Sequence, residues 1–219
     1  MNEKSLKTCR CLLTAAVLVA ASATPASAQS PSPAGRPPRG KQAVLFLAGA
    51  ASGLGLHESG HVIFGAAFGA HPRVKRIDYG PAPFFAIVHD PVTRRKEYVI
   101  SSAGFWMQHA GSERILNARP WLKDEDAPFL KGVLAFNIGT SLVYSAAAFG
   151  RFGPPERDTR GMASSLGKDG IPEPVVGLLV LGPAALDAYR YVRPDAAWAK
   201  WTSRGAKIAM VVLTIAAGR

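Results

Sequence analysis

Apolar residues in this chain are gathered into long runs, separated by polar segments and by segments rich in Gly and Pro. The longest run, residues 43–70, reads AVLFLAGAASGLGLHESGHVIFGAAFGA and is long enough to cross a lipid bilayer as a helix. Apolar stretches at 127–149, 173–192 and 206–218 predict further helices, the last of them short for a full crossing. The pattern therefore predicts a mainly α protein, a polytopic helical bundle in a membrane.

The pattern changes after the first apolar run. Segments 74–79 and 84–89 are rich in β-branched and aromatic residues and lie on either side of a Gly-Pro-Ala-Pro sequence, which predicts a small β hairpin. Residues 97–116 then fit a helix whose far end is too polar for a simple crossing. The number of crossings between 97 and 126, and with it the side of the C-terminus, stays open.

The N-terminal segment has the order of a secretory signal. Residues 1–28 begin with basic side chains, continue with an apolar stretch and end on small residues in an A-x-A pattern; an uncleaved first membrane helix is the alternative. Residues 29–42 are rich in Pro, Ser and Gly and predict a flexible linker. A single membrane domain is then expected over residues 43–219.

The first apolar run contains the sequence His57-Glu58-Ser59-Gly60-His61, which has the HExxH pattern. On a helix, positions i and i+4 project from one face, so both imidazoles can bind one metal ion with Glu58 beside it. Ionisable groups within a membrane-spanning segment are costly and usually functional. The motif therefore predicts a metal site, and its ligand types favour zinc, although iron, cobalt or manganese also accept such ligands.

Charge and cysteine content narrow the class of protein. The formal net charge is +11, yet Lys and Arg fall in short groups between apolar runs, as in loops that flank membrane spans. No basic face with aromatic residues is evident, which argues against nucleic-acid binding. The two cysteines, Cys9 and Cys11, lie in the segment that a signal peptidase would remove. A zinc site must then use His and carboxylate ligands, which favours a catalytic site over a structural one.

A catalytic zinc ion takes three protein ligands, so His57 and His61 need a third. Asp158 is the first candidate because it follows a Pro-Pro break after an apolar helix, where irregular backbone can aim a carboxylate inward; a helix N-cap is its alternative role. Asp187 is the second candidate, and Glu113 and Glu156 follow. Zinc lowers the pKa of water toward ~7, and Glu58 is placed to accept the water's proton and pass it to a leaving amine.

The order of these features resembles the site-2 protease family of intramembrane zinc metalloproteases. In that family an HExGH sequence on a membrane helix is followed by short strands, by a helix with an A-G-P-x-x-N-like turn, and by an L-D-G segment that supplies an aspartate ligand. This chain has the HExGH letters, both strand-like segments and Ala103-Gly104-Phe105-Trp106-Met107-Gln108. Phe105 and Gln108 replace the family's Pro and Asn, and no L-D-G occurs. Asp158 lies at a family-like distance, whereas Leu186-Asp187 matches the letters better.

The resemblance implies a multi-pass protein of the cell membrane, a zinc metalloendopeptidase that hydrolyses peptide bonds of membrane-protein substrates within or near the lipid bilayer. Gln108 would then either hydrogen-bond to an extended substrate or pack between helices. Two alternatives remain: a non-catalytic membrane protein of the same fold that binds metal or assists assembly, and an envelope zinc peptidase that uses Glu113 as a ligand. The sequence names no particular substrate and no oligomeric state.

Overall fold

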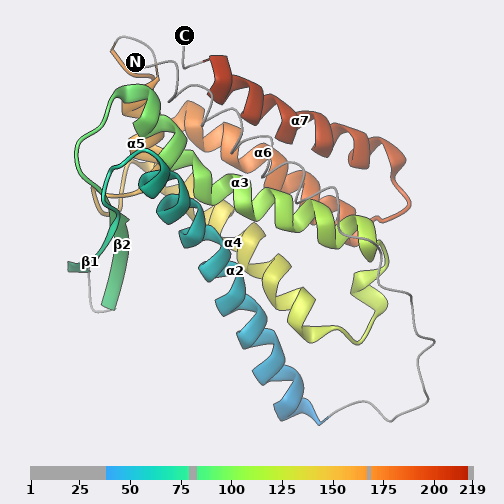
Figure 1. Ribbon diagram of the computed structural model, residues 1–219. Helices are drawn as coiled ribbons and strands as arrows, with labels where there is room; N and C mark the ends of the chain where they lie inside the picture. The colour runs from blue at the N-terminus through green and yellow to red at the C-terminus, as the bar shows by residue number, and fades with distance from the viewer. Residues whose placement is uncertain (1–37, 79–82, 167–168, 217–219) are drawn as a thin grey trace.

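The computed structural model of this chain describes residues 38–78, 83–166 and 169–216 (Figure 1). Residues 1–28, with the predicted signal peptide or first membrane helix, and most of the predicted linker lie outside the described residues. The described elements, in order, are α2 (Arg39–Ala67), β1 (Arg73–Asp78), β2 (Pro83–Val88), α3 (Arg94–Ala118), the 3-10 turn η1 (Leu122–Asp124), α4 (Pro128–Gly150), α5 (Asp158–Ser165), α6 (Glu173–Val192) and α7 (Ala197–Ala216). The predicted mainly helical fold with one hairpin is confirmed.

Several helix boundaries differ from the sequence prediction by a few residues, and the starts of α2 and α7 show why. α2 begins at Arg39, so the last residues of the predicted linker are helical; the backbone N–H of Gln42 donates to the carbonyl of Pro38 at 3.2 Å, which closes the first turn. α7 begins at Ala197 instead of residue 206. Its first turns carry Trp, Lys and Arg, so the apolar pattern alone placed its start too late.

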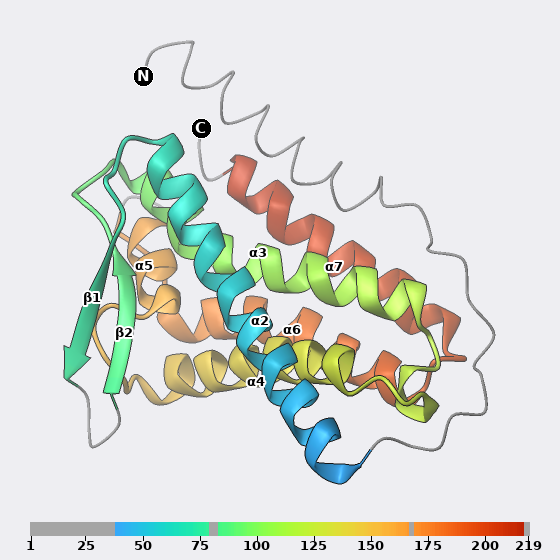
Figure 2. The same cartoon turned by 60° about the horizontal axis from the view of Figure 1, so that its bottom comes forward.

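The hairpin joins β1 and β2 in antiparallel register, from Arg73 opposite Val88 to Asp78 opposite Pro83. It lies at the end of the bundle where α2 ends and α3 begins, close to α5 (Figure 2). The backbone N–H of Asp90 donates to the carbonyl of Ala70 at 2.8 Å and ties the exit of the hairpin to its entrance. This hydrogen bond holds the hairpin at the end of the bundle, beside the start of α3 (Figure 2).

α3 is the central helix, and α2, α4, α5, α6 and α7 all pack against it. Its residues from Tyr98 to Phe105 are all buried, although the segment contains polar Ser101 and Ser102. The largest apolar cluster joins α3 to α5 and α6 through Phe105, Met162 and Val176. The sequence predicted that residues 97–116 are too polar for a simple membrane crossing. The structure shows that this polar helix is surrounded by other helices.

α2 and α4 approach closely because glycines lie where they meet. A Cβ added at Gly49 would overlap the backbone carbonyl of Phe129, and one added at Gly132 would overlap that of Phe46. At Gly53 an added Cβ would lie 2.8 Å from the Phe136 ring. The small-residue spacing of Gly49 and Gly53 thus does permit close contact with another helix.

A buried ionic network fixes α7 to α3 and α6. Asp187 accepts hydrogen bonds from Lys207 at 2.7 Å and from Ser203 at 2.9 Å. Glu113 of α3 pairs with Arg190, Lys207 and Arg204. Since a buried charge without its partner is strongly destabilising, these pairs hold the three helices in one arrangement.

Among the described residues, two helices are long and apolar enough to cross a membrane: α4 and α6. α2 is long enough to cross a membrane, at 29 residues, but it is not apolar enough. Its two histidines, Glu58 and several glycines lower the mean hydropathy of the run that the sequence suggested as the first span. α7, with basic residues in its first half, also falls short.

The α2–α4 contact can be tested by adding one methyl group. Gly49→Ala should lower the free energy of unfolding by about 1–3 kcal/mol, because the new Cβ forces the two helices apart. Gly55→Ala on the same helix has open space around the added Cβ and should leave stability unchanged or raise it by up to about 1 kcal/mol. Thermal unfolding in detergent measures both variants; equal stabilities would contradict the close approach.

Candidate metal centre

His57 and His61 project from the same face of α2, one turn apart, and are buried to 2% and 4% exposure. Their Nε2 atoms lie 3.2 Å apart. His61 donates its Nδ1 proton to the backbone carbonyl of Ile100 at 2.8 Å. This hydrogen bond fixes the tautomer, so the Nε2 lone pair of His61 faces the neighbouring imidazole and is available to a metal ion.

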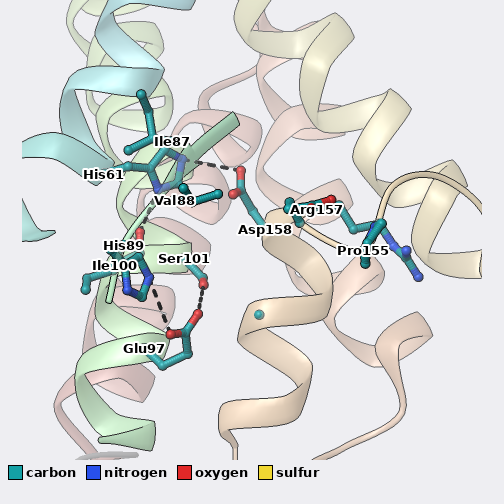
Figure 3. A pocket seen from close by; sticks show the side chains of 12 residues that line it. His61, Ile87, Val88, His89, Glu97, Ile100, Ser101, Pro155, Arg157 and Asp158 are labelled. Atoms are coloured by element: carbon teal, nitrogen blue, oxygen red, sulfur yellow. Dashed lines mark hydrogen bonds and ion pairs between the residues drawn. The ribbon is translucent and has the colours of Figure 1, made fainter. Parts of the chain in front are cut away.

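Asp158 meets both imidazoles although it lies 101 residues after His57. Its Oδ2 is 3.0 Å from Nε2 of His57 and 3.4 Å from Nε2 of His61. Asp158 is the first residue of α5, and no side-chain hydrogen bond caps that helix. The alternative N-cap role is therefore not seen, and the carboxylate faces the histidines, as Figure 3 shows for His61.

Contacts of the residues on both sides of Asp158 fix the position of α5. Arg157 forms a bidentate ion pair with Glu173 of α6, and Thr159 donates to the same carboxylate at 2.7 Å. One turn later, a Cβ added at Gly161 would overlap the Ser101 side chain of α3. The helix is thus tied to α6 and packed against α3, and Asp158 at its start is directed toward the two histidines of α2.

Glycines also determine how close α2 comes to α3 at the motif. A Cβ added at Gly60 would lie 2.6 Å from the carbonyl oxygen of Ala103. A Cβ added at Gly104 would lie 2.5–2.7 Å from three atoms of the His57 imidazole ring. The glycine in HExGH and the glycine in the Ala103-Gly104 pair therefore have one physical role, since each removes a side chain where the backbone of one helix contacts the other.

Three acceptor atoms converge in this arrangement, and electrostatics requires a positive charge between them. Burial by itself would raise the pKa of the Asp158 carboxyl, but when a proton on His61 supplies the positive charge, this charge and the hydrogen bonds with both imidazoles hold that pKa well below its usual range. Asp158 is therefore ionised at neutral pH, as metal ligation needs. A proton or a metal ion can supply the balancing charge.

The donor set could hold a metal ion, and its spacing is compatible with zinc. The ligand atoms of His57, His61 and Asp158 all lie within 4.8 Å of one another, and within the described ranges they form one group able to hold a metal. Around a tetrahedral zinc with bonds of about 2.0–2.1 Å, neighbouring ligand atoms are roughly 3.3–3.4 Å apart. The observed separations of 3.0, 3.2 and 3.4 Å are close to that spacing.

Other carboxylates considered from the sequence lie elsewhere. Asp187 and Glu113 belong to the ionic network of α3, α6 and α7 and not to the His57–His61 group. Glu156 accepts a hydrogen bond from Lys75 of β1 at 2.7 Å. The structure thus brings together His57, His61 and Asp158 and separates Asp187 from them.

Two cavities adjoin the group. The smaller, of about 230 Å³, is lined on one side by His61 and Asp158 and on the other by Glu97, His89 and Ser101 (Figure 3). The larger, of about 560 Å³, lies between α2 and α4 and is lined by His57, Glu58 and mostly apolar side chains. Glu58, the predicted proton carrier, therefore faces an open space directly beside the histidines.

The structure adds one residue to the site and separates another from it. Tyr144 of α4 stacks on His57 at 6.0 Å between ring centres and lies within hydrogen-bonding reach of Asp158; no motif singled it out. Gln108, a proposed substrate contact, is completely buried and lines neither of the two cavities. Its position favours the helix-packing role.

Comparison with known proteins adds no relative: neither protein-family models nor searches of curated proteins and solved structures give a match. The functional argument therefore depends on the residues of the site.

Metal content can test the ligand assignment. Asp158→Asn should lower zinc affinity more than about 100-fold, because the loss of a partner outside the ligand set already costs about 10–100-fold. Glu156→Gln, two residues away, should bind zinc like the wild type. Asp187→Asn should retain the metal while losing thermal stability, since Lys207 and Arg190 lose a buried charged partner.

Elemental analysis and competition with a chelator would measure these affinities in detergent-purified protein. Loss of zinc in Asp187→Asn with retention in Asp158→Asn would show that the ligand assignment is wrong.

Proposed function

We propose that this chain is a zinc-dependent endopeptidase of the cell membrane, which hydrolyses peptide bonds of membrane proteins within or near the bilayer. The observation that carries the proposal is the convergence of His57, His61 and Asp158, with their ligand atoms within 4.8 Å, beside Glu58 and an open cavity. Three ligands of this kind leave one coordination position free, which is the arrangement of catalytic rather than structural zinc sites.

In this proposal His57, His61 and Asp158 hold the zinc ion. A zinc ion held there would supply a Lewis acid and would lower the pKa of water toward about 7. Glu58 accepts the proton of the attacking water and transfers it to the nitrogen of the leaving amine, so that the amine departs uncharged. Tyr144 stacks on His57 and lies beside Asp158. In this proposal its hydroxyl donates to the oxygen on which negative charge develops.

The membrane setting is supported by side chains on the outside of the bundle. α4 and α6 are long and apolar enough to cross a bilayer. Large apolar side chains of α2, α4, α6 and α7 are exposed, among them Leu47, Val143, Leu178 and Ile208, each at more than 60%. An apolar exterior of this extent favours lipid as the surrounding medium.

The end of the bundle away from the hairpin has the composition of a membrane–water interface. Exposed tryptophans lie there at Trp121, Trp198 and Trp201, near the loops that join α3 to α4 and α6 to α7 (Figure 1). Arg119, Lys123, Arg193 and Lys200 are in the same loops and first turns. Trp and basic residues concentrate at such interfaces, so this end is proposed to lie at the headgroup level.

The order of HExGH helix, hairpin, glycine-bearing helix and late aspartate supports membership of the site-2 protease family as part of this proposal. The non-catalytic alternative was suggested by the missing L-D-G and hence by a missing third ligand. Asp158 lies where a third ligand is needed, so that reason no longer favours it. Glu113 pairs with three cations of α6 and α7, which removes the argument for a peptidase that uses it as a ligand.

Glu58→Gln separates metal binding from proton transfer. The variant should keep about one zinc per chain, because the ligands are unchanged, and should lose at least about 100-fold in cleavage rate, the usual contribution of a general acid–base group. Zinc content and cleavage of unfolded casein and of a detergent-solubilised single-span peptide measure the two properties. Glu125→Gln, a carboxylate paired with Arg119 far from the motif, is the matched control. Full activity in Glu58→Gln would contradict the mechanism.

A further inference from the structure

The larger cavity shares two residues with the metal centre. His57 and Glu58 form part of its wall, and the cavity of about 560 Å³ extends from them between α2 and α4 toward β2. Its volume lies within the range of small-molecule binding pockets. A group bound at the metal centre therefore has room beside it on the Glu58 side.

The chemistry of this cavity is apolar. Leu54 of α2, Phe85 of β2, and Phe136 and Val143 of α4 contribute most of its lining, with Tyr144 next to His57. The smaller cavity on the other side of the centre is polar, with Glu97 paired to His89 and accepting from Ser101 at 3.0 Å. The two sides of the metal centre thus offer different environments to a peptide.

Gly139 lies in the wall of the apolar cavity. It lies in the middle of α4 and lines the space, and a Cβ added to it would meet nothing within 4 Å. Glycine in a helix interior costs about 1 kcal/mol relative to alanine, and no close helix contact explains this one. The missing side chain leaves space that a ligand can use.

We propose that this cavity receives a bulky apolar side chain of the substrate, that of the residue immediately after the scissile bond, and that Gly139 sets the size it accepts. The inference rests on the proposed peptidase function. Glu58 must reach the nitrogen of the leaving amine, so the residue that carries this nitrogen lies on the Glu58 side of the centre. That side is the apolar cavity, and burial of a Leu or Phe side chain there favours binding.

Hydroxamates test the cavity without requiring turnover, because they bind zinc through their own oxygens. Zinc-loaded wild type should bind 4-phenylbutanohydroxamate about 10- to 100-fold more tightly than acetohydroxamate, the gain expected from burying a large apolar group. In Gly139→Leu this advantage should fall below about 3-fold while acetohydroxamate binds as before. Gly205→Leu, at an exposed glycine of α7 that also has open space around an added Cβ, should behave as wild type. Isothermal titration measures all three proteins.

The outcomes separate the two proposals. If wild type binds acetohydroxamate but gains nothing from the phenyl group, or if Gly139→Leu keeps the full gain, the cavity assignment is wrong and the metal centre stands. If wild type binds neither compound, the metal centre fails and both proposals fall. Should Gly139→Leu lose acetohydroxamate binding through misfolding, Val143→Trp fills the cavity from a 66% exposed position at its rim and should remove the phenyl advantage.

The side of the scissile bond is tested by mapping the cut sites in casein digests by mass spectrometry. Wild type should cut before Leu, Ile, Phe or Met, and Gly139→Leu should shift the following residue toward Ala and Ser. Cuts that place the bulky apolar residue before the bond would overturn the assignment of the side. Hydroxamate binding without any cleavage would contradict the peptidase function and, with it, this assignment.

Discussion

The geometry of the candidate metal centre depends on the contact between the His57 imidazole and the backbone of α3. The ring lies against Gly104, where no side chain of any size would fit, and Gly60 brings the backbone of α2 against Ala103 in the same place. Two helices that touch through backbone have little freedom to slide or rotate. The carbonyl of Ile100 in the same helix accepts the His61 proton, so α3 determines the orientation of both imidazoles without contributing a ligand.

Charge balance links this contact to the rest of the bundle. The carboxylate of Asp158 lies partly buried against two imidazoles, and α5 is too short to hold it there alone. The ion pair of Arg157 with Glu173 ties α5 to α6, which packs against α3, α4 and α7. The network of Asp187, Arg190 and Lys207 then fixes α6 and α7. Helices that carry no ligand thus contribute to the site indirectly: α7 holds α6 in place, and α6 holds α5.

The parts of this arrangement that depend on local sequence patterns can be predicted from the sequence. Apolar runs predicted α4 and α6 closely, and the i, i+4 spacing predicted that His57 and His61 face one point. Asp158 could be ranked above Asp187 from the Pro-Pro break and its distance from the motif. α5 was indicated only by the alternative N-cap role of Asp158, because eight mostly polar residues have no apolar period. The positions of Tyr144 and of buried Gln108 had no local signal, since only the packing of α4 on α2 and α3 decides them.

The separation of 101 residues between His57 and Asp158 has a consequence for biosynthesis. At about 5–20 residues per second, the carboxylate leaves the ribosome roughly 5–20 s after the histidine. During this interval α2, the hairpin, α3 and α4 emerge, and their contacts can form while the ligand set is incomplete. The eight-residue helix α5 then converts a pair of buried imidazoles into a three-ligand centre, so a metal ion would be retained firmly only by a nearly finished chain.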